Sequence, residues 1–124
     1  VDRGTARLAD RFTPFHPSVV RLLKRIVEAG KGANLDVSVC GEMASDPRAA
    51  ILLLGLGYRV LSISPARLPL VRWLIRQFDA GVAESVAAEA VEAPTTGKVV
   101  SLLTEAIDGL VDVDLLPSKL VAQG

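Results

Sequence analysis

The stretch that decides the fold is Val37-Ser38-Val39-Cys40-Gly41-Glu42-Met43-Ala44-Ser45-Asp46-Pro47. It begins with a short apolar, β-branched run typical of a strand, and this run ends at Cys40, the only cysteine of the chain. Asp46 offers a carboxylate that can cap a helix, and Pro47 suits a first helical position because an N–H has no intrahelical partner there. The stretch therefore predicts a strand from Val37 to Cys40, a polar turn and a helix.

The same order of elements follows a second time. Arg59-Val60-Leu61-Ser62-Ile63 is another apolar run, and Ser64-Pro65 is expected to open another helical segment. Two strand–helix units in succession predict neighbouring parallel strands with helices packed outside them. In such folds the functional groups gather at the carboxyl ends of the strands, and Cys40 lies at such an end.

The bulk composition narrows the class of protein. The chain has 124 residues, enough for one domain, and half of them are apolar, so a core can form. Lys plus Arg and Asp plus Glu both number 14, so no global basic field attracts nucleic acid or an anionic membrane. A single cysteine excludes an intrachain disulfide and favours a reducing compartment. No apolar run approaches the roughly 18–20 residues of a membrane span. We expect a cytoplasmic protein with neither nucleic acid nor a membrane as partner.

Helical spacing or propensity marks most of the remaining chain. Residues 47–56 are expected to form a short helix buried on more than one side and ended by Gly55 and Gly57. Four more helices are expected. One begins at Pro17 and ends at Gly30 and Gly32, and another has Pro69 in its first turn and Trp73 in the core. A third covers residues 80–93, and the last follows a cap at Thr95 or Thr96. Only two convincing strands thus accompany four to five helices. A lone parallel pair leaves open edges, so the pattern indicates part of a larger sheet.

Several motifs in this order resemble one family. They are Cys40-Gly41-Glu42-Met43-Ala44, Asp46-Pro47, Leu52-Leu53-Leu54-Gly55-Leu56-Gly57 and Leu61-Ser62-Ile63-Ser64-Pro65. The family is the C-terminal, phosphoenolpyruvate (PEP)-binding (β/α)8 barrel of PEP-protein phosphotransferase, Enzyme I of the sugar phosphotransferase system. Further likenesses are Val1-Asp2-Arg3-Gly4, Pro94-Thr95-Thr96 and His16-Pro17-Ser18-Val19-Val20, and the His-Pro-Ser form resembles the nitrogen-related paralogue.

The resemblance implies an α/β fold in which residues 1–113 form the C-terminal portion, about three βα units, of a TIM barrel, and residues 114–124 form a flexible tail. A full barrel needs roughly 250 residues. The family's phosphate-accepting histidine, metal-binding carboxylates and most PEP-binding arginines lie upstream. Mg²⁺ is therefore expected only in the full-length parent, with no ligand in this chain. The implied partners are PEP and pyruvate, a phosphocarrier protein reached through the parent, and a second copy in a homodimer.

The resemblance also assigns site residues. Cys40 matches the family cysteine that protonates the enolate left when PEP gives its phosphoryl group to a histidine, and a thiol can release a proton near neutral pH; a buried structural cysteine is the alternative. Arg3 matches an arginine that clamps the PEP phosphate, for which a guanidinium offers paired donors; an ordinary surface arginine is the alternative. Gly41 leaves room for a ligand. Glu42 either orders the loop or has a structural role, as a salt bridge or a backbone cap.

Three nearby residues receive structural roles. Asp46 is expected to be a helix cap. Ser45 stands where the family more often has glycine, so its backbone must either avoid positive φ or tolerate some energetic cost. His16, the only histidine, lies at a helix start and is not expected to accept phosphate.

Three functions follow. The leading one is part of a phosphotransferase that moves the phosphoryl group of PEP to a protein histidine and releases pyruvate, with this segment inactive alone. The second is a fragment of a PEP synthase or pyruvate phosphate dikinase, because these enzymes share the Cys-Gly-Glu core. The third is a non-catalytic module that self-associates through its open strand edges.

Overall fold

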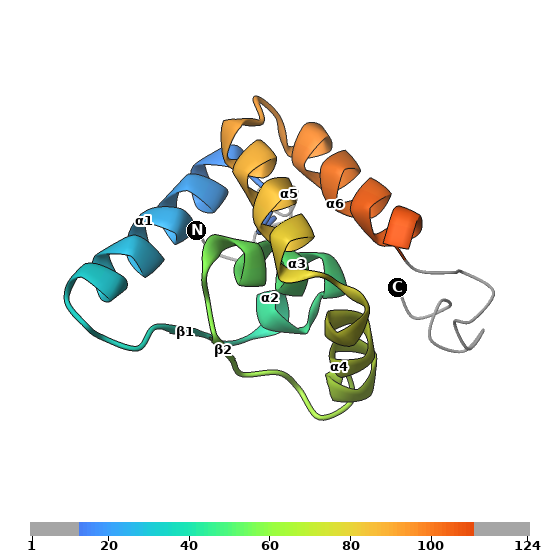
Figure 1. The fold of residues 1–124 in the computed structure, drawn as a ribbon, viewed down its shortest axis with the longest axis horizontal. Coiled ribbons are helices and arrows are strands. Elements are labelled where there is room, and N and C mark those ends of the chain that lie inside the picture. Colours follow the sequence, from blue (N-terminus) through green and yellow to red (C-terminus); the bar gives the residue numbers. More distant parts are fainter. Residues whose placement is uncertain (1–12, 111–124) are drawn as a thin grey trace, which may run out of the picture.

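The computed structural model describes residues 13–110. Arg3, the expected turn over residues 5–11 and the expected tail at residues 114–124 lie outside this range. The described elements run in the order α1 (Pro17–Gly32), β1 (Ser38–Val39), α2 (Glu42–Ser45), α3 (Pro47–Leu56), β2 (Val60–Leu61), α4 (Leu68–Gln77), α5 (Ala80–Glu92) and α6 (Thr96–Leu110) (Figure 1). The described part therefore contains six helices, one more than expected, because α2 forms a single turn where a loop was predicted.

The two strands pair in parallel, as predicted. Ser38 lies opposite Val60 and Val39 opposite Leu61. Each strand is shorter than its apolar run, so Cys40 lies one residue beyond the end of β1. The ladder continues one step past the assigned strands, because the N–H of Ser62 donates to the carbonyl oxygen of Val39 at 2.9 Å.

One face of this strand pair is covered and the other is open. Val37, Val39 and Leu61 pack against the cluster formed by Val27, Leu53 and Tyr58. The side chains that alternate with them are exposed: Ser38, Cys40, Val60 and Ser62. Successive strand residues point to opposite faces, so these four share the side away from the helices. An open face with an exposed valine is what a piece of a larger sheet presents.

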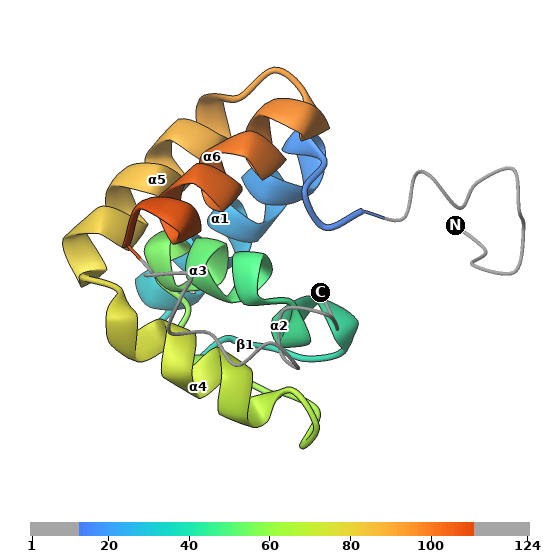
Figure 2. The ribbon, with the colours of Figure 1, turned by 90° about the vertical axis from the view of Figure 1, so that its right-hand side faces the viewer.

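Helix α3 lies at the centre of the described fold (Figures 1 and 2). It contacts α1, α2, α4, α5 and α6. The residues from Ala49 to Leu53 are fully buried, which confirms a helix buried on more than one side. Burying one leucine or isoleucine side chain contributes about 1.5–3 kcal/mol, so this run is a main apolar anchor of the fold.

Helices α3 and α5 approach each other closely at Gly55. A Cβ added there would overlap the carbonyl oxygen of Ala83 and lie 2.7 Å from the Cβ of Ala87. Gly55 lies within α3, so the expectation that it ends the helix is wrong. Gly57 ends it instead, with φ of 109°.

Pro69 lies in the first turn of α4, as predicted, but Ser64 and Pro65 precede this helix and do not open it. The carbonyl oxygen of Ser64 accepts from the N–H groups of Arg67 (3.0 Å) and Leu68 (3.2 Å), so Ser64 and Pro65 form a turn and the helix starts at Leu68. Trp73 is half-buried and packs beside the cluster of Ile51, Leu74 and Ala83, at the edge of the core.

Side chains cap the last two helices, and of these caps only the one at Thr95 was predicted. The Asp79 carboxylate accepts from the N–H of Gly81 (2.7 Å) at the start of α5. The Thr95 hydroxyl accepts from the N–H of Lys98 (3.1 Å) at the start of α6. None of the helices within residues 13–110 has the length and apolarity needed to cross a membrane.

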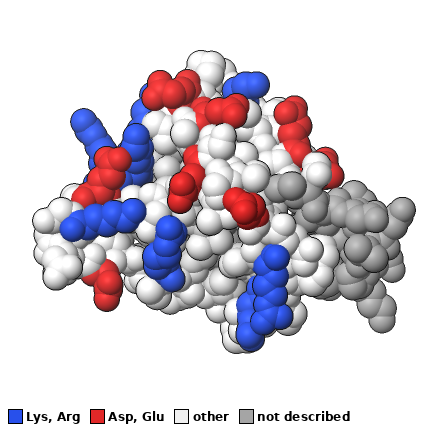
Figure 3. Space-filling model, viewed as in Figure 1, with Lys and Arg blue, Asp and Glu red and all other residues white. Residues whose placement is uncertain are grey.

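Charged side chains are spread over the surface with a mild separation of sign. In the view of Figure 3, Lys and Arg lie mainly over α1 and α4, and Asp and Glu mainly over α5 and α6. The residues between Pro47 and Phe78 include five arginines and no acidic residue.

Candidate functional site

The candidate site lies where β1 and β2 end. Cys40 follows β1, and its side chain is exposed, so it is not the buried structural cysteine that was the alternative. Gly41 has φ of 89° and ψ of −164°, a conformation that is essentially restricted to glycine. A Cβ on Gly41 would meet no heavy atom within 4 Å. Glycine is therefore required by the backbone turn, and the space beside it is open.

A cleft of about 1180 Å³ opens beside these strand ends. Gly41 and Glu42 line it, and Cys40 lies immediately before them in the chain. The rest of the lining comes from α2, α3, the segment after β2 and the end of α6: Ser45, Asp46, Pro47, Arg48, Ser62, Ser64, Arg67, Thr104, Ile107 and Asp108. The strand ends thus bring together Gly41 and Glu42 from the predicted site with three serines that were not predicted.

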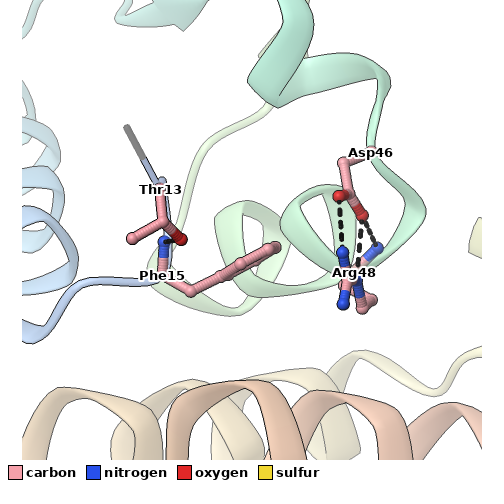
Figure 4. A network of polar contacts seen from close by, with 4 residues as sticks. All are labelled: Thr13, Phe15, Asp46 and Arg48. Atoms are coloured by element: carbon pink, nitrogen blue, oxygen red, sulfur yellow. Dashed lines mark hydrogen bonds and ion pairs between the residues drawn. The ribbon is translucent and has the colours of Figure 1, made fainter. Parts of the chain in front are cut away.

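The start of α3 holds a compact polar group (Figure 4). Asp46 Oδ1 accepts from the N–H of Arg48 at 2.9 Å, which confirms Asp46 as the helix cap. Asp46 Oδ2 also accepts from the guanidinium of Arg48 at 3.0 Å. That guanidinium lies 4.9 Å from the centre of the Phe15 ring. Arg48 is thereby paired and stacked, and it ties the segment before α1 to the start of α3.

Ser45 joins the two strand ends through its side chain. Its hydroxyl oxygen accepts from the N–H of Ser64 at 3.1 Å. Among the described residues only Asn34 combines a side chain with positive φ, so Ser45 avoids that region. The sequence carried no signal for the bond, because its partners are 19 positions apart and follow no periodic pattern.

Glu42 and His16 occupy simple surroundings. Glu42 is the first residue of α2, and its side chain is exposed, so its ordering role stays a prediction. His16 caps α1, because its Nδ1 accepts from the N–H of Ser18 at 3.2 Å. This is a structural role, as expected for a histidine beside Pro17.

The described residues offer no metal centre. Within residues 13–110, no three side chains of the types His, Cys, Asp and Glu gather closely enough to hold an ion. Of the acidic residues that line the cleft, Asp46 is engaged with Arg48 and Glu42 is exposed. These residues do not fit a Mg²⁺ site, and no step of the chemistry is assigned to a metal bound here.

Comparison with known proteins identifies the family. Residues 1–80 match the model of the PEP-binding domain of PEP-utilising enzymes. The chain belongs to this family. Its mostly helical fold with two parallel strands is that of a partial PEP-binding TIM-barrel domain.

Relatives of the chain are much longer than the chain itself. It is 35% identical over 105 residues to a PEP-protein phosphotransferase of Haemophilus influenzae, covering 85% of this chain and 18% of the relative. It is 36% identical over 78 residues to that of Borreliella burgdorferi, covering 63% and 14%. It is 36% identical over 99 residues to a PEP-dependent phosphotransferase system protein of Salmonella typhimurium, covering 80% and 13%. The chain thus spans less than a fifth of the length of these relatives.

Proposed function

We propose that this chain supplies the proton donor of a PEP-protein phosphotransferase, with Cys40 as the acid that converts enolpyruvate to pyruvate. The position of Cys40 carries the proposal. It is the only cysteine, it is exposed, and it lies at the carboxyl end of a parallel strand beside the open space at Gly41. A proton donor must reach one face of its substrate, and this placement leaves the thiol accessible.

The proposed reaction has two parts. The phosphorus–oxygen bond of PEP breaks as a phosphorus–nitrogen bond forms on a histidine in the upstream part of the full-length parent, and the enolate of pyruvate remains. The methylene carbon of the enolate then takes the proton from the Cys40 thiol, and solvent returns a proton to the thiolate. Gly41 provides room for the ligand, and Glu42 at the cleft edge is proposed to order the loop.

The remaining parts of the site are proposed from the resemblance. Arg3, outside the described residues, is proposed as a clamp for the PEP phosphate, because a guanidinium binds phosphate oxygens in pairs. Mg²⁺ would be held by upstream carboxylates of a full-length parent, which would pass phosphate to a phosphocarrier protein in the cytoplasm. Residues 1–113 are proposed as the barrel part and residues 114–124 as a tail. Alone, the chain should not accept phosphate from PEP.

A chimaera tests the proposal. Residues 1–124 replace the matching C-terminal segment of the Haemophilus influenzae phosphotransferase, with which they share 35% identity. Pyruvate release and transfer of labelled phosphate from PEP to protein are measured for the chimaera, for Cys40→Ala and for Ser38→Ala. Ser38 is a matched control, because it is exposed on the same strand face two residues earlier.

The chimaera should form pyruvate, Cys40→Ala should lower the rate at least a hundredfold, within the usual range for a general acid, and Ser38→Ala should leave it nearly unchanged. Equal rates in a folded Cys40→Ala chimaera would reject the role of Cys40. In the full-length parent of this chain, a water-dependent reaction or phosphorylation of pyruvate to PEP would favour the synthase or dikinase alternative.

Exposed apolar side chains of the described fold favour a second candidate function, a module that self-associates. The same observation supports the homodimer that the resemblance implies. Val60 on the open sheet face is 51% exposed, and Leu22 and Ile26, one turn apart on α1, are 55% and 42% exposed. Apolar side chains in such positions are suited to an interface. Sedimentation of the chain over a hundredfold concentration range should show a dimer at the upper end. A single monomeric species throughout would reject it.

A further inference from the structure

The segment from Cys40 to Ala44 is an excursion from the sheet that is fixed at both of its ends. At its start, the carbonyl oxygen of Val39 accepts from the N–H of Ser62 at 2.9 Å. At its end, the hydroxyl oxygen of Ser45 accepts from the N–H of Ser64 at 3.1 Å. Both bonds go to the same short stretch after β2. The loop that carries Cys40 is therefore bracketed by two bonds to residues two positions apart on the neighbouring strand end.

The two halves of the excursion are held differently. Ala44 is fully buried and Met43 packs beside two apolar clusters, so apolar packing holds the second half of the excursion in place. Cys40, Gly41 and Glu42 are exposed, and within residues 13–110 the side chains of Cys40 and Glu42 form no hydrogen bond or ion pair. The order of this first half therefore depends on the backbone conformation of Gly41 and on the two bracketing bonds.

Only one of the two bracketing bonds comes from a side chain. The bond at Val39 continues the sheet and would form with almost any residue there. The bond at Ser45 requires a hydroxyl, and a glycine or alanine at this position would leave the N–H of Ser64 without that acceptor. Since Ser64 is exposed, water can replace the bond, and its net worth is that of an ordinary neutral hydrogen bond.

We infer that Ser45 is a positioning residue that latches the Cys40 loop to the end of the neighbouring strand through the N–H of Ser64. The latch closes the excursion that places Gly41 and Glu42 in the lining of the same cleft as Ser62 and Ser64. Its importance for catalysis rests on the proposed function of Cys40. The latch itself is a property of the chain and is measured without PEP.

NMR on the uniformly ¹⁵N-labelled full chain tests the latch. Two quantities are read from each sample: the hydrogen exchange rate of the Ser64 amide, and the backbone order parameters of Cys40, Gly41 and Glu42. The variants are Ser45→Ala, which removes the acceptor, Ser45→Thr, which keeps a hydroxyl, and Asp79→Ala. The last is a stability control, because it removes the cap of α5 away from the cleft.

Ser45→Ala should raise the exchange rate of the Ser64 amide about two- to tenfold, the loss expected for one net neutral hydrogen bond. The order parameters of Cys40 to Glu42 should fall from about 0.85, typical of rigid backbone, towards 0.6. Ser45→Thr should restore both quantities, and Asp79→Ala should change neither in the loop. An unchanged Ser64 amide in Ser45→Ala would overturn the latch, and a faster amide with unchanged loop order would overturn its positioning role.

The chimaera adds the catalytic measurement. Ser45→Ala should lower the rate of pyruvate formation while the KM for PEP changes little, and Ser45→Thr should recover the rate. A chimaera that is inactive with Ser45 in place would count against the proposed function of Cys40, and the NMR result would still decide whether Ser45 is a latch.

Discussion

Replacing Gly55 by alanine tests the packing at the centre of the fold. In an exposed helix interior this change stabilises by roughly 1 kcal/mol, because alanine has the higher helix propensity. At Gly55 the added Cβ would overlap the carbonyl oxygen of Ala83 and come within 2.7 Å of the Cβ of Ala87. The contacted atoms include backbone, which cannot rotate away. Helices α3 and α5 must separate, and overpacking of this kind typically costs about 1–3 kcal/mol and occasionally more.

We therefore expect a net loss of about 2 kcal/mol in the free energy of unfolding, which lowers the urea midpoint by about 1 M for a small protein. The unfolding can be followed by the fluorescence of Trp73, the only tryptophan. Gly32→Ala is the control, because a Cβ at this last residue of α1 meets no heavy atom within 4 Å. A Gly55→Ala variant as stable as the parent chain would refute the close α3–α5 contact.

Three further changes act on other parts of the fold. Gly41→Ala should cost about 1–3 kcal/mol in unfolding free energy, because φ of 89° with ψ of −164° is strained for any residue with a Cβ; an unchanged urea midpoint would contradict this conformation. Asp46→Ala should lower the unfolding free energy by about 1–2 kcal/mol, because the helix cap is lost. Asp46→Asn keeps an acceptor oxygen and should lower it less. Equal losses in both variants would assign the effect to the partly exposed ion pair with Arg48. Tyr58→Phe should cost about 1 kcal/mol, because the hydroxyl donates to the carbonyl oxygen of Leu23 at 2.7 Å. Burial raises the pKa of Tyr58 above its ordinary value of 10.0, so Tyr58 ionises at lower pH in the unfolded chain than in the folded one. The difference in unfolding free energy between the parent chain and Tyr58→Phe should therefore shrink as pH rises above 10.0. A constant difference up to about pH 11 would contradict the raised pKa.

The sequence predicts the helices that have strong local signals. Helix α3 was predicted with both bounds correct, because Asp46-Pro47 marks its start and Gly57 its end. Helix α1 was predicted from Pro17 and the helical spacing of its apolar residues. The parallel strand pair was also predicted, but both strands were predicted too long, because each apolar run extends beyond the residues that pair. Local capping and periodicity therefore account for most of the described elements.

Features that depend on distant contacts could not be predicted. The sequence predicts a helix end at Gly55. Its actual role is to allow the close approach of α5, which lies about thirty residues later in the chain. The single turn of α2 is too short to show a period. In the candidate site, Cys40, Gly41 and Glu42 were predicted from a motif, and their roles stay predictions. The bond from Ser64 to Ser45 could not be predicted, because it depends on the pairing of two strand ends.

The central position of α3 has a consequence for the unfolded chain. The run from Ala49 to Tyr58 contains no charged residue, and Arg48 and Arg59 flank it directly. In the folded chain Ala49 to Leu53 are shielded by the surrounding helices. When the chain unfolds, an uncharged, leucine-rich run of this kind is prone to aggregate, and flanking charges act as gatekeepers against it. The segment that fills the centre of the fold is thus also its main aggregation hazard, with two arginines to keep unfolded copies apart.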